Sequence, residues 1–244
     1  MERSALPVSV QDKQDRLAEL LPRVAPVAFA KERMLPIVDA LEPLLGEGLV
    51  RGSILGCRGG AAVSVALASA AGASAAGSWL AVAGLPSLGL RAASEVGIAL
   101  ERLVMIADPS MREAQLTESA WVNMMSAMID GFDLIVVRSP VVSNAATVRR
   151  LQTRLHVRGA VLVVVGDPGP FSCDVVIAGQ SGGWEGLGHG SGRLLRRRLT
   201  LTASGRRLPR ERRVDVWLPG ATGGIEIAEP LSPSEIDIGA RRAG

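Results

Sequence analysis

The feature that most constrains the fold is an alternation of short apolar runs with longer helical patterns. Five strand-length runs rich in Val, Leu, Ile and Ala lie at 52–57, 78–84, 102–108, 132–139 and 159–167. Helical spacing or small-residue composition marks the segments between them, at 59–73, 87–100, 112–131 and 143–158. Strands that are apolar throughout are buried on both faces. The pattern therefore predicts an α/β fold with a mostly parallel central sheet flanked by helices.

The pattern changes after Asp167, where helical spacing ends. Four later segments alternate polar with apolar residues and are joined by Gly, Ser and Pro turns, which predicts antiparallel strands that extend one edge of the sheet near the C-terminus. We expect one core domain at 47–230, an N-terminal arm with helices at 1–46, and a mobile tail at 231–244.

Two helices are predicted before the core. The first begins near Asp12, and its Leu17, Leu20 and Leu21 have helical spacing. The second covers 34–45. The three leucines would bind a neighbouring subunit or a partner, or else pack on the chain's own core, and the sequence does not choose between an oligomer and a monomer.

Composition excludes several classes of protein. No apolar run reaches the roughly 20 residues that span a bilayer, so we expect a cytoplasmic protein without membrane contact. Cys57 and Cys173 are the only cysteines, too few for a disulfide framework or a zinc site. Lys and Arg together number 27 against 24 acidic residues, so the chain as a whole is not an obvious polyanion binder.

A glycine-rich turn, "LGCRGGAAVS" at 55–64, follows the first core strand. Nucleotide-binding folds place a phosphate loop there, ending in Gly-Lys-Ser/Thr; the lysine reaches the outer phosphates and the hydroxyl binds magnesium. Here the lysine position is Ala62 and the hydroxyl position is Val63. The degenerate loop consists of Gly56, Gly59, Gly60, Ala61, Ala62 and Val63.

From these residues the chain resembles the RecA core. In that family an Asp follows the apolar strand that "FDLIVVRSP" matches, and Arg138 stands at its position. A catalytic Glu follows the strand that "LAVAG" matches, and Pro86 stands there. The resemblance thus implies that three catalytic positions are empty together, at Ala62, Pro86 and Arg138. We expect no ATP hydrolysis, no cofactor and no metal. Arg138 would instead bind an anion or a partner's carboxylate, or pair with a neighbouring acid.

A later stretch, "GGWEGLGHGSGRLLRRRLTL", resembles a motif of the RecA-like accessory proteins of the inducible mutagenesis cassette, the ImuA-prime/ImuA group. The resemblance covers about 34–229. It implies a non-catalytic adaptor in SOS-induced translesion synthesis, docking an ImuB-like inactive Y-family polymerase homologue and, indirectly, an error-prone C-family polymerase. Such a protein would associate with the nucleoid under DNA damage. The alternatives are a RecA-fold cell-division inhibitor and a modulator that binds DNA or the RecA filament.

The same stretch supplies the candidate binding residues. Trp184 and Glu185 would dock a partner, or else belong to a glycine-rich loop of tight turns at 182–192. An arginine cluster follows, which would track a DNA backbone or coat a solvated hairpin. Its candidate DNA-binding residues are Arg193, Arg196, Arg197, Arg198, Arg206 and Arg207.

Overall fold

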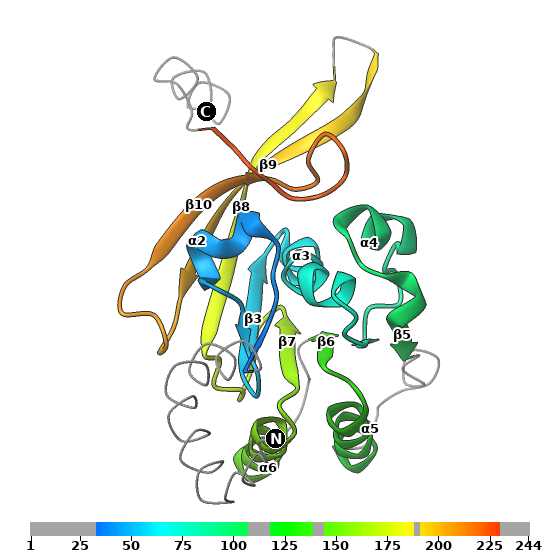
Figure 1. Ribbon diagram of the computed structural model, residues 1–244, viewed down its shortest axis with the longest axis vertical. Helices are drawn as coiled ribbons and strands as arrows, with labels where there is room; N and C mark the ends of the chain where they lie inside the picture. The colour runs from blue at the N-terminus through cyan, green and yellow to red at the C-terminus, as the bar shows by residue number, and fades with distance from the viewer. Residues whose placement is uncertain (1–32, 107–117, 139–143, 188–190, 230–244) are drawn as a thin grey trace, which may run out of the picture.

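A central sheet forms the core of the computed structural model, which describes residues 33–106, 118–138, 144–187 and 191–229 (Figure 1). Within these residues the sheet has nine strands in the order β11-β10-β9-β8-β3-β7-β6-β4-β5. The strands are β3 (Ile54–Gly59), β4 (Leu80–Ala83), β5 (Leu103–Ile106), β6 (Leu134–Arg138), β7 (Val161–Val165), β8 (Val175–Leu187), β9 (Gly192–Ser204), β10 (Arg212–Trp217) and β11 (Glu226–Ile227). All five predicted core strands are present, as β3 to β7, and the predicted fold class is confirmed.

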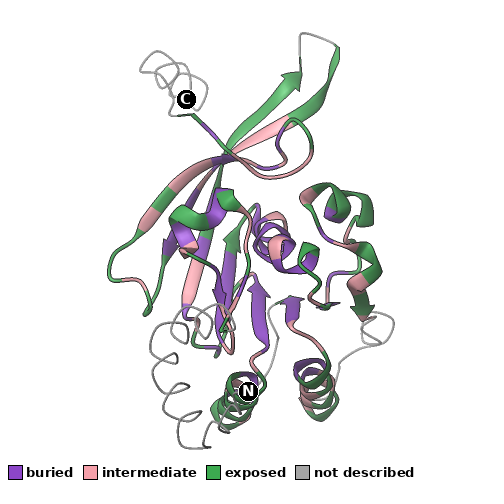
Figure 2. Ribbon diagram, in the orientation of Figure 1, coloured by how far each residue is buried: buried purple, intermediate pink, exposed green. Residues whose placement is uncertain are grey.

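Helices cover both faces of the sheet. They are α3 (Ala62–Ala75), α4 (Leu90–Val96), α5 (Glu118–Gly131) and α6 (Ala145–Arg158), with a short 3-10 helix η2 (Leu100–Arg102) after α4. One buried cluster joins α3 and α4 to Leu55 and Cys57 of β3, and a second joins α5 and α6 to Ile54. Neighbouring strand residues thus face opposite helical layers, as the pleat requires. Figure 2 shows the buried strands between them. No helix in the described part of the chain is long and apolar enough to cross a membrane.

The pairing of β8 differs from the sequence-based expectation. The antiparallel extension was expected to begin with this segment, but β8 pairs parallel to β3, with Leu55 opposite Val175 and Gly59 opposite Gly179. Only its other edge pairs antiparallel, with β9. β7 already has β3 and β6 as neighbours, so the chain crosses to the free edge of β3. The parallel part of the sheet therefore has six strands.

The predicted helix at 34–45 is wrong over its first five residues, and the rest forms a 3-10 turn and a short α-helix. Met34–Leu35 forms a short strand, β1, antiparallel to β2 (Leu49–Val50). A 3-10 turn, η1 (Asp39–Leu41), leads into α2 (Glu42–Leu45). Pro36 explains the difference, because a residue before proline favours an extended backbone. The other predicted N-terminal helix, with Leu17, Leu20 and Leu21, lies outside the described residues, as does the tail at 231–244.

The glycine-rich run that was interpreted as a loop is a strand up to Leu187. Its residues form the outer half of β8, and the register with β9 shifts between Ser181 and Gly183 and again between Glu185 and Leu187. Such shifts are β-bulges, which glycine accommodates. Gly186 shows why: its φ is +102°, and a Cβ there would lie 2.2 Å from the carbonyl oxygen of Arg193. The glycines therefore bend a continuous hairpin.

Candidate functional site

The glycine turn after β3 is too short to wrap a phosphate group. Arg58 and Gly59 still pair with β8, and α3 begins at Ala62, so only Gly60 and Ala61 connect strand to helix. Gly59 has a φ of +87°, and a Cβ there would lie 2.4 Å from the carbonyl oxygen of Gly179. The close approach of β8 therefore explains this glycine without any bound anion.

The two positions that carry chemistry in a phosphate loop face the core instead. Ala62 is buried within the α3 cluster, and Val63 packs against that cluster. The next residue, Ser64, carries a hydroxyl, but its Oγ accepts a hydrogen bond of 3.2 Å from Arg197 of β9. The first turn of α3 is thus occupied by the protein's own side chains.

The carboxyl edge of the sheet holds a cation at one of the two positions where the RecA pattern has an acid. Arg138 ends β6, and its Nε donates to the carbonyl oxygen of Gly84 (3.1 Å), at the end of β4. Pro86 lies exposed two residues further on. Among the described residues Arg138 thus contacts a carbonyl group, and not the neighbouring acid that one of its two sequence-based interpretations expected. No group of three His, Cys, Asp or Glu side chains that could hold a metal occurs among residues whose placement is described.

A second cation, Arg58, lies at this edge, with its guanidinium 3.7 Å from the carboxylate of Asp167. It does not join Arg138 around one ligand. Cys57 and Val137 belong to opposite clusters, so by alternation Arg58 faces the α5–α6 layer and Arg138 the α3–α4 layer. Within the part of the chain that the structure describes, the edge therefore offers no convergent set of charges for a triphosphate.

Both cysteines near the turn are free thiols. Burial is the main cause that raises the pKa of Cys57 well above its usual value, and burial also raises the pKa of Cys173 to about 11. Neither group is a thiolate at neutral pH, so the described turn has no activated nucleophile.

Four exposed large apolar side chains lie at the tip of the β8–β9 hairpin, which projects from the body at the top of Figure 1. Trp184, Leu187, Leu194 and Leu195 are 44%, 64%, 49% and 48% exposed. We call these four residues the hairpin tip. Figure 2 shows the exposed colour along this projection. Trp184 was a predicted docking residue, whereas the leucines were not; adjacent leucines next to glycines in "GRLL" were the available signal.

The two faces of the hairpin differ in their contacts. Trp184 lies opposite Arg197 in the strand register, and the guanidinium carbon of Arg197 is 5.2 Å from the indole centroid. Arg197 also donates to the carbonyl oxygen of Leu218 (3.0 Å) and to Ser64 of α3. Burial lowers the pKa of its guanidinium, although arginine still remains charged. This face therefore ties the hairpin to the body.

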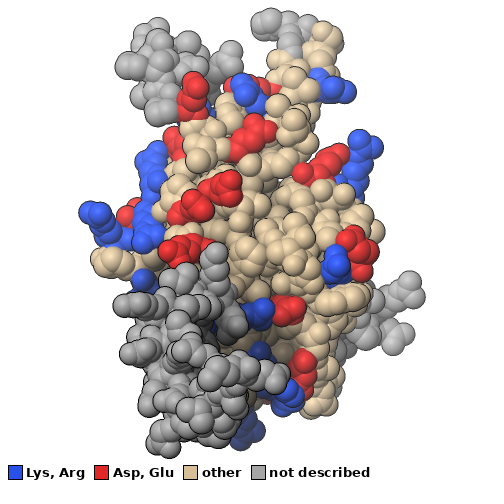
Figure 3. All heavy atoms as spheres, in the orientation of Figure 1, with Lys and Arg blue, Asp and Glu red and all other residues tan. Residues whose placement is uncertain are grey.

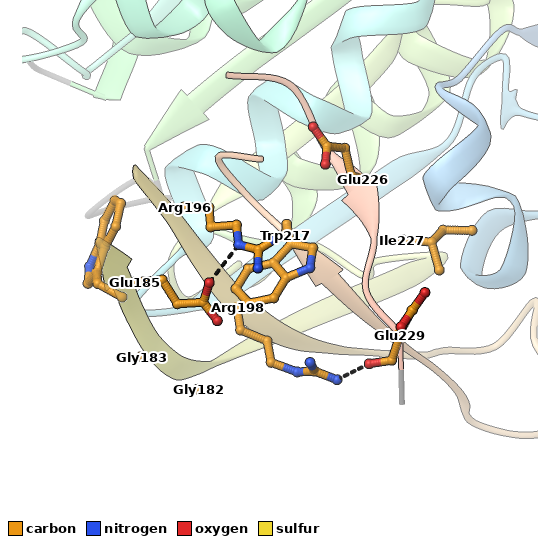
Figure 4. Close-up of a pocket in the computed structure, with 10 residues that line it drawn as sticks. Gly182, Gly183, Glu185, Arg196, Arg198, Trp217, Glu226, Ile227 and Glu229 are labelled. Atoms are coloured by element: carbon orange, nitrogen blue, oxygen red, sulfur yellow. Dashed lines mark hydrogen bonds and ion pairs between the residues drawn. The ribbon is translucent and has the colours of Figure 1, made fainter. Parts of the chain in front are cut away.

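A polar groove of about 590 Å³ adjoins the neighbouring cross-strand pair, Glu185 and Arg196 (Figure 4). Arg196 donates to Glu185 (2.7 Å), and its guanidinium carbon lies 4.0 Å above the ring of Trp217. Arg198 lies 5.6 Å from the same ring centroid. The remaining lining residues are Gly182, Gly183, Trp184, Glu226, Ile227 and Glu229. Glu185 thus orients an arginine across the hairpin and lies on a wall of the groove.

The predicted DNA-binding arginines do not gather on one surface. Arg206 and Arg207 follow β9 at the end remote from the tip, and both donate to the nearly buried Asp174 (3.0 and 2.9 Å). Asp174 also accepts from the backbone amide of Ile54 (2.9 Å). Burial raises the pKa of this carboxyl group, but these hydrogen bonds and the two arginine charges outweigh it, so the net pKa is below its usual value. Asp174 therefore connects the start of β8 to β3 and to the turn after β9.

The other members of the set lie along β9. Arg198 contacts the carboxylate of Asp215 (3.5 Å) and donates to the backbone carbonyl of Glu229. Arg196 and Arg197 have the contacts given above. The side chain of Arg193 has no hydrogen bond or ion pair within the described residues. Most of these guanidinium groups therefore stabilise the antiparallel part of the sheet.

Comparison with known protein families identifies a family for the central part of the chain. Residues 43–170 match the family described as the MT3502 N-terminal domain, which is more than half of the chain. The chain belongs to this MT3502 N-terminal domain family. The matched region ends between β7 and β8, so the projecting hairpin lies outside it.

The fold is similar to that of a solved recombinase. The crystal structure of the RadB recombinase aligns with a TM-score of 0.56 and 13% identity, covering 78% of this chain and 97% of that one. At this identity the likeness shows the fold alone, and that fold is RecA-like. No curated protein sequence matches significantly.

Proposed function

We propose that this member of the MT3502 N-terminal domain family is a non-catalytic RecA-fold adaptor in SOS-induced mutagenic translesion DNA synthesis. It docks an ImuB-like, inactive Y-family polymerase homologue and through it brings an error-prone C-family polymerase to damaged DNA. The observation that carries the proposal is the hairpin tip, where four large apolar side chains are exposed on a projecting arm. Exposed apolar patches on protein surfaces mark interaction sites.

The absence of catalysis is supported by the residues at the carboxyl edge. Ala62 and Val63 face the core, and Pro86 and Arg138 occupy the acidic positions of the RecA pattern. A triphosphate there would lack both the lysine and the magnesium ligands that compensate its charge. Calorimetry with ATP and magnesium tests this point, and we expect no binding heat. Saturable heat, lost in an Arg138→Ala variant, would contradict it.

The adaptor role is tested by co-purification with a recombinant ImuB-like protein. Three leucines of the hairpin tip are replaced together, as Leu187→Ser, Leu194→Ser and Leu195→Ser. We expect capture to fall at least tenfold, because each substitution removes a large apolar contact from the arm. The matched control is Leu90→Ser with Leu100→Ser, which changes leucines 48% and 41% exposed on α4 and η2. Thermal unfolding of each variant shows that it is folded.

Two outcomes would overturn the adaptor proposal. In the first, the ImuB-like protein fails to bind the wild-type chain. In the second, the tip variant and the α4 control lose binding equally. A tubulin-like division protein captured from damaged cells would favour the cell-division inhibitor, and the RecA filament would favour the filament modulator.

A further inference from the structure

Helix α6 presents a solvent face made of arginine. The helix begins after Asn144, whose side chain accepts from the backbone amide of Thr147 (2.9 Å), and ends at Gly159 in a left-handed conformation. Val148, Leu151 and Leu155 are buried against the α5 layer. The rest of the helix faces solvent and contains no acidic residue. Its cationic side chains are Arg149, Arg150, Arg154 and Arg158.

Three of these arginines form a regular row. Arg150, Arg154 and Arg158 are spaced four residues apart, which places successive side chains on one face at steps of about 6 Å. Arg149 extends the row sideways at its start. Figure 3 shows basic side chains at the lower end of the molecule, where Figure 1 places α6. A row of this kind presents a repeating positive charge about 12 Å long.

The described acids around α6 compensate this charge incompletely. Asp130 of α5 accepts from Arg154 (2.9 Å) and Arg158 (3.0 Å). Asp133 pairs with Arg51 (3.1 Å), and Glu118 accepts from the backbone of Asn144 at the start of the helix. Arg51 and the four arginines of α6 thus face three described carboxylates. Arg149 and Arg150 have no ion-pair partner among the residues described.

Asp130 also orients two side chains of the row, Arg154 and Arg158. Hydrogen bonding from Arg154 is the main cause that lowers the pKa of Asp130 to about 2, so this carboxylate stays charged at neutral pH. One carboxylate then holds two guanidinium groups in place, although each has five N–H donors. Donors that Asp130 does not use remain available to an outside acceptor. An arranged row loses less conformational entropy on binding than free arginines do.

We infer that the exposed face of α6 binds the phosphate backbone of double-stranded DNA without reading its sequence. The face offers guanidinium groups, which suit phosphate oxygens. It offers no Phe, Tyr or Trp side chain on which a base could stack, because α6 contains none of these. Its arginines also differ from those of β9, most of which have partners within the sheet. The inference does not depend on the partner of the hairpin tip, which lies on another part of the chain.

The test is fluorescence anisotropy of the full chain with a labelled DNA duplex across a salt series. We expect log K to fall linearly with log salt for the wild type. In the variant Arg149→Ser with Arg150→Ser, the slope should decrease in magnitude by about 2, because two phosphate contacts are lost. These two arginines lack ion-pair partners in the described structure, so the variant should fold normally.

The control removes the same charge elsewhere. Arg91→Ser with Arg102→Ser changes two arginines of α4 and η2, and we expect the wild-type slope. Undetectable DNA binding at 50 mM salt, or the same loss of slope in both double variants, would overturn the inference. Poly-glutamate provides a further arm. If it binds more tightly than the duplex and with the same dependence on Arg149 and Arg150, the face binds an acidic protein and the inference is wrong.

Discussion

The two ends of the β8–β9 hairpin are built from the same pair of strands but have different surroundings. At its base, Ile177, Leu201 and Ala203 are fully buried in the cluster that includes α3, and Asp174 accepts hydrogen bonds from two arginines of the turn after β9. At its tip, Trp184 and the three leucines are exposed. Backbone pairing continues from one end to the other, so pairing alone does not explain the apolar tip. The difference separates residues that stabilise the fold from exposed residues, to which the proposed adaptor role assigns the binding of a partner.

The largest expected effect is at the base. Asp174→Ala leaves Arg206, Arg207 and the amide of Ile54 without their acceptor. Hydrogen bonds to a charged group contribute about 1.5–3 kcal/mol each, and the two arginines are about half exposed, so the combined loss is about 3 kcal/mol. We therefore expect a loss of this order in the free energy of unfolding, measured by urea denaturation. A loss below about 1 kcal/mol, which is typical of surface pairs, would remove the distinction between base and tip.

A smaller effect is expected where the base meets the glycine turn. Gly59→Ala places a Cβ against the carbonyl oxygen of Gly179 in a positive-φ conformation, and strain of this kind costs about 1–3 kcal/mol. We expect the loss in thermal and urea unfolding to be the same with and without ATP. Stabilisation of the wild type alone by ATP would indicate that this glycine serves an anion site.

Low pH should reduce the contribution of Asp174, at the base of the hairpin, to the free energy of unfolding. The folded-state pKa of Asp174 lies below its unfolded value of about 3.9. Its contribution is therefore fully present above that value and is lost as the pH falls through the lower, folded pKa. We expect unfolding free energies measured from pH 5 to pH 2 to decline less steeply in Asp174→Asn than in the wild type. Parallel curves would contradict the assignment.

The smallest effect on stability is expected at the tip. Leu187→Ser, Leu194→Ser and Leu195→Ser each change an exposed side chain, and such substitutions usually stay within about 0.5 kcal/mol. Urea denaturation of the three single variants measures this directly. A loss of 2 kcal/mol in any one would show that the tip packs against the protein itself, and the contrast between the two ends would disappear.

Most of the fold was predictable because its signal is local. A strand buried on both faces is apolar throughout, as β4, β6, β7 and most of β3 are. β5 is also apolar in sequence, but it lies at the edge of the sheet, where Val104 and Met105 are exposed. The parallel pairing of β8 was not predictable in this way, because it depends on which strand edge is free. The run around Gly183 and Gly186 was interpreted as a loop because glycine marks turns and bulges alike.

The candidate site also has parts that the sequence predicts and parts that it does not. The residues at Ala62, Pro86 and Arg138 could be read from the sequence, since each follows a recognisable strand. The roles of the arginines could not be predicted, because the sequence does not distinguish an arginine that pairs with Asp174 from one that faces solvent. Their partners lie far along the chain; Arg207 and Asp174, for example, are 33 residues apart. The row on α6 became visible only once its neighbours were known.

Because Trp184 lies at the hairpin tip, its intrinsic fluorescence can report whether the tip is covered. Its indole is about half exposed and lies beside the Arg197 guanidinium. A protein that covers the tip would move this ring from water into less polar surroundings, and the fluorescence emission of Trp184 would shift to shorter wavelength. Occupancy of the hairpin can therefore be followed in solution without attaching a dye, once Trp79, Trp121 and Trp217 are replaced by phenylalanine.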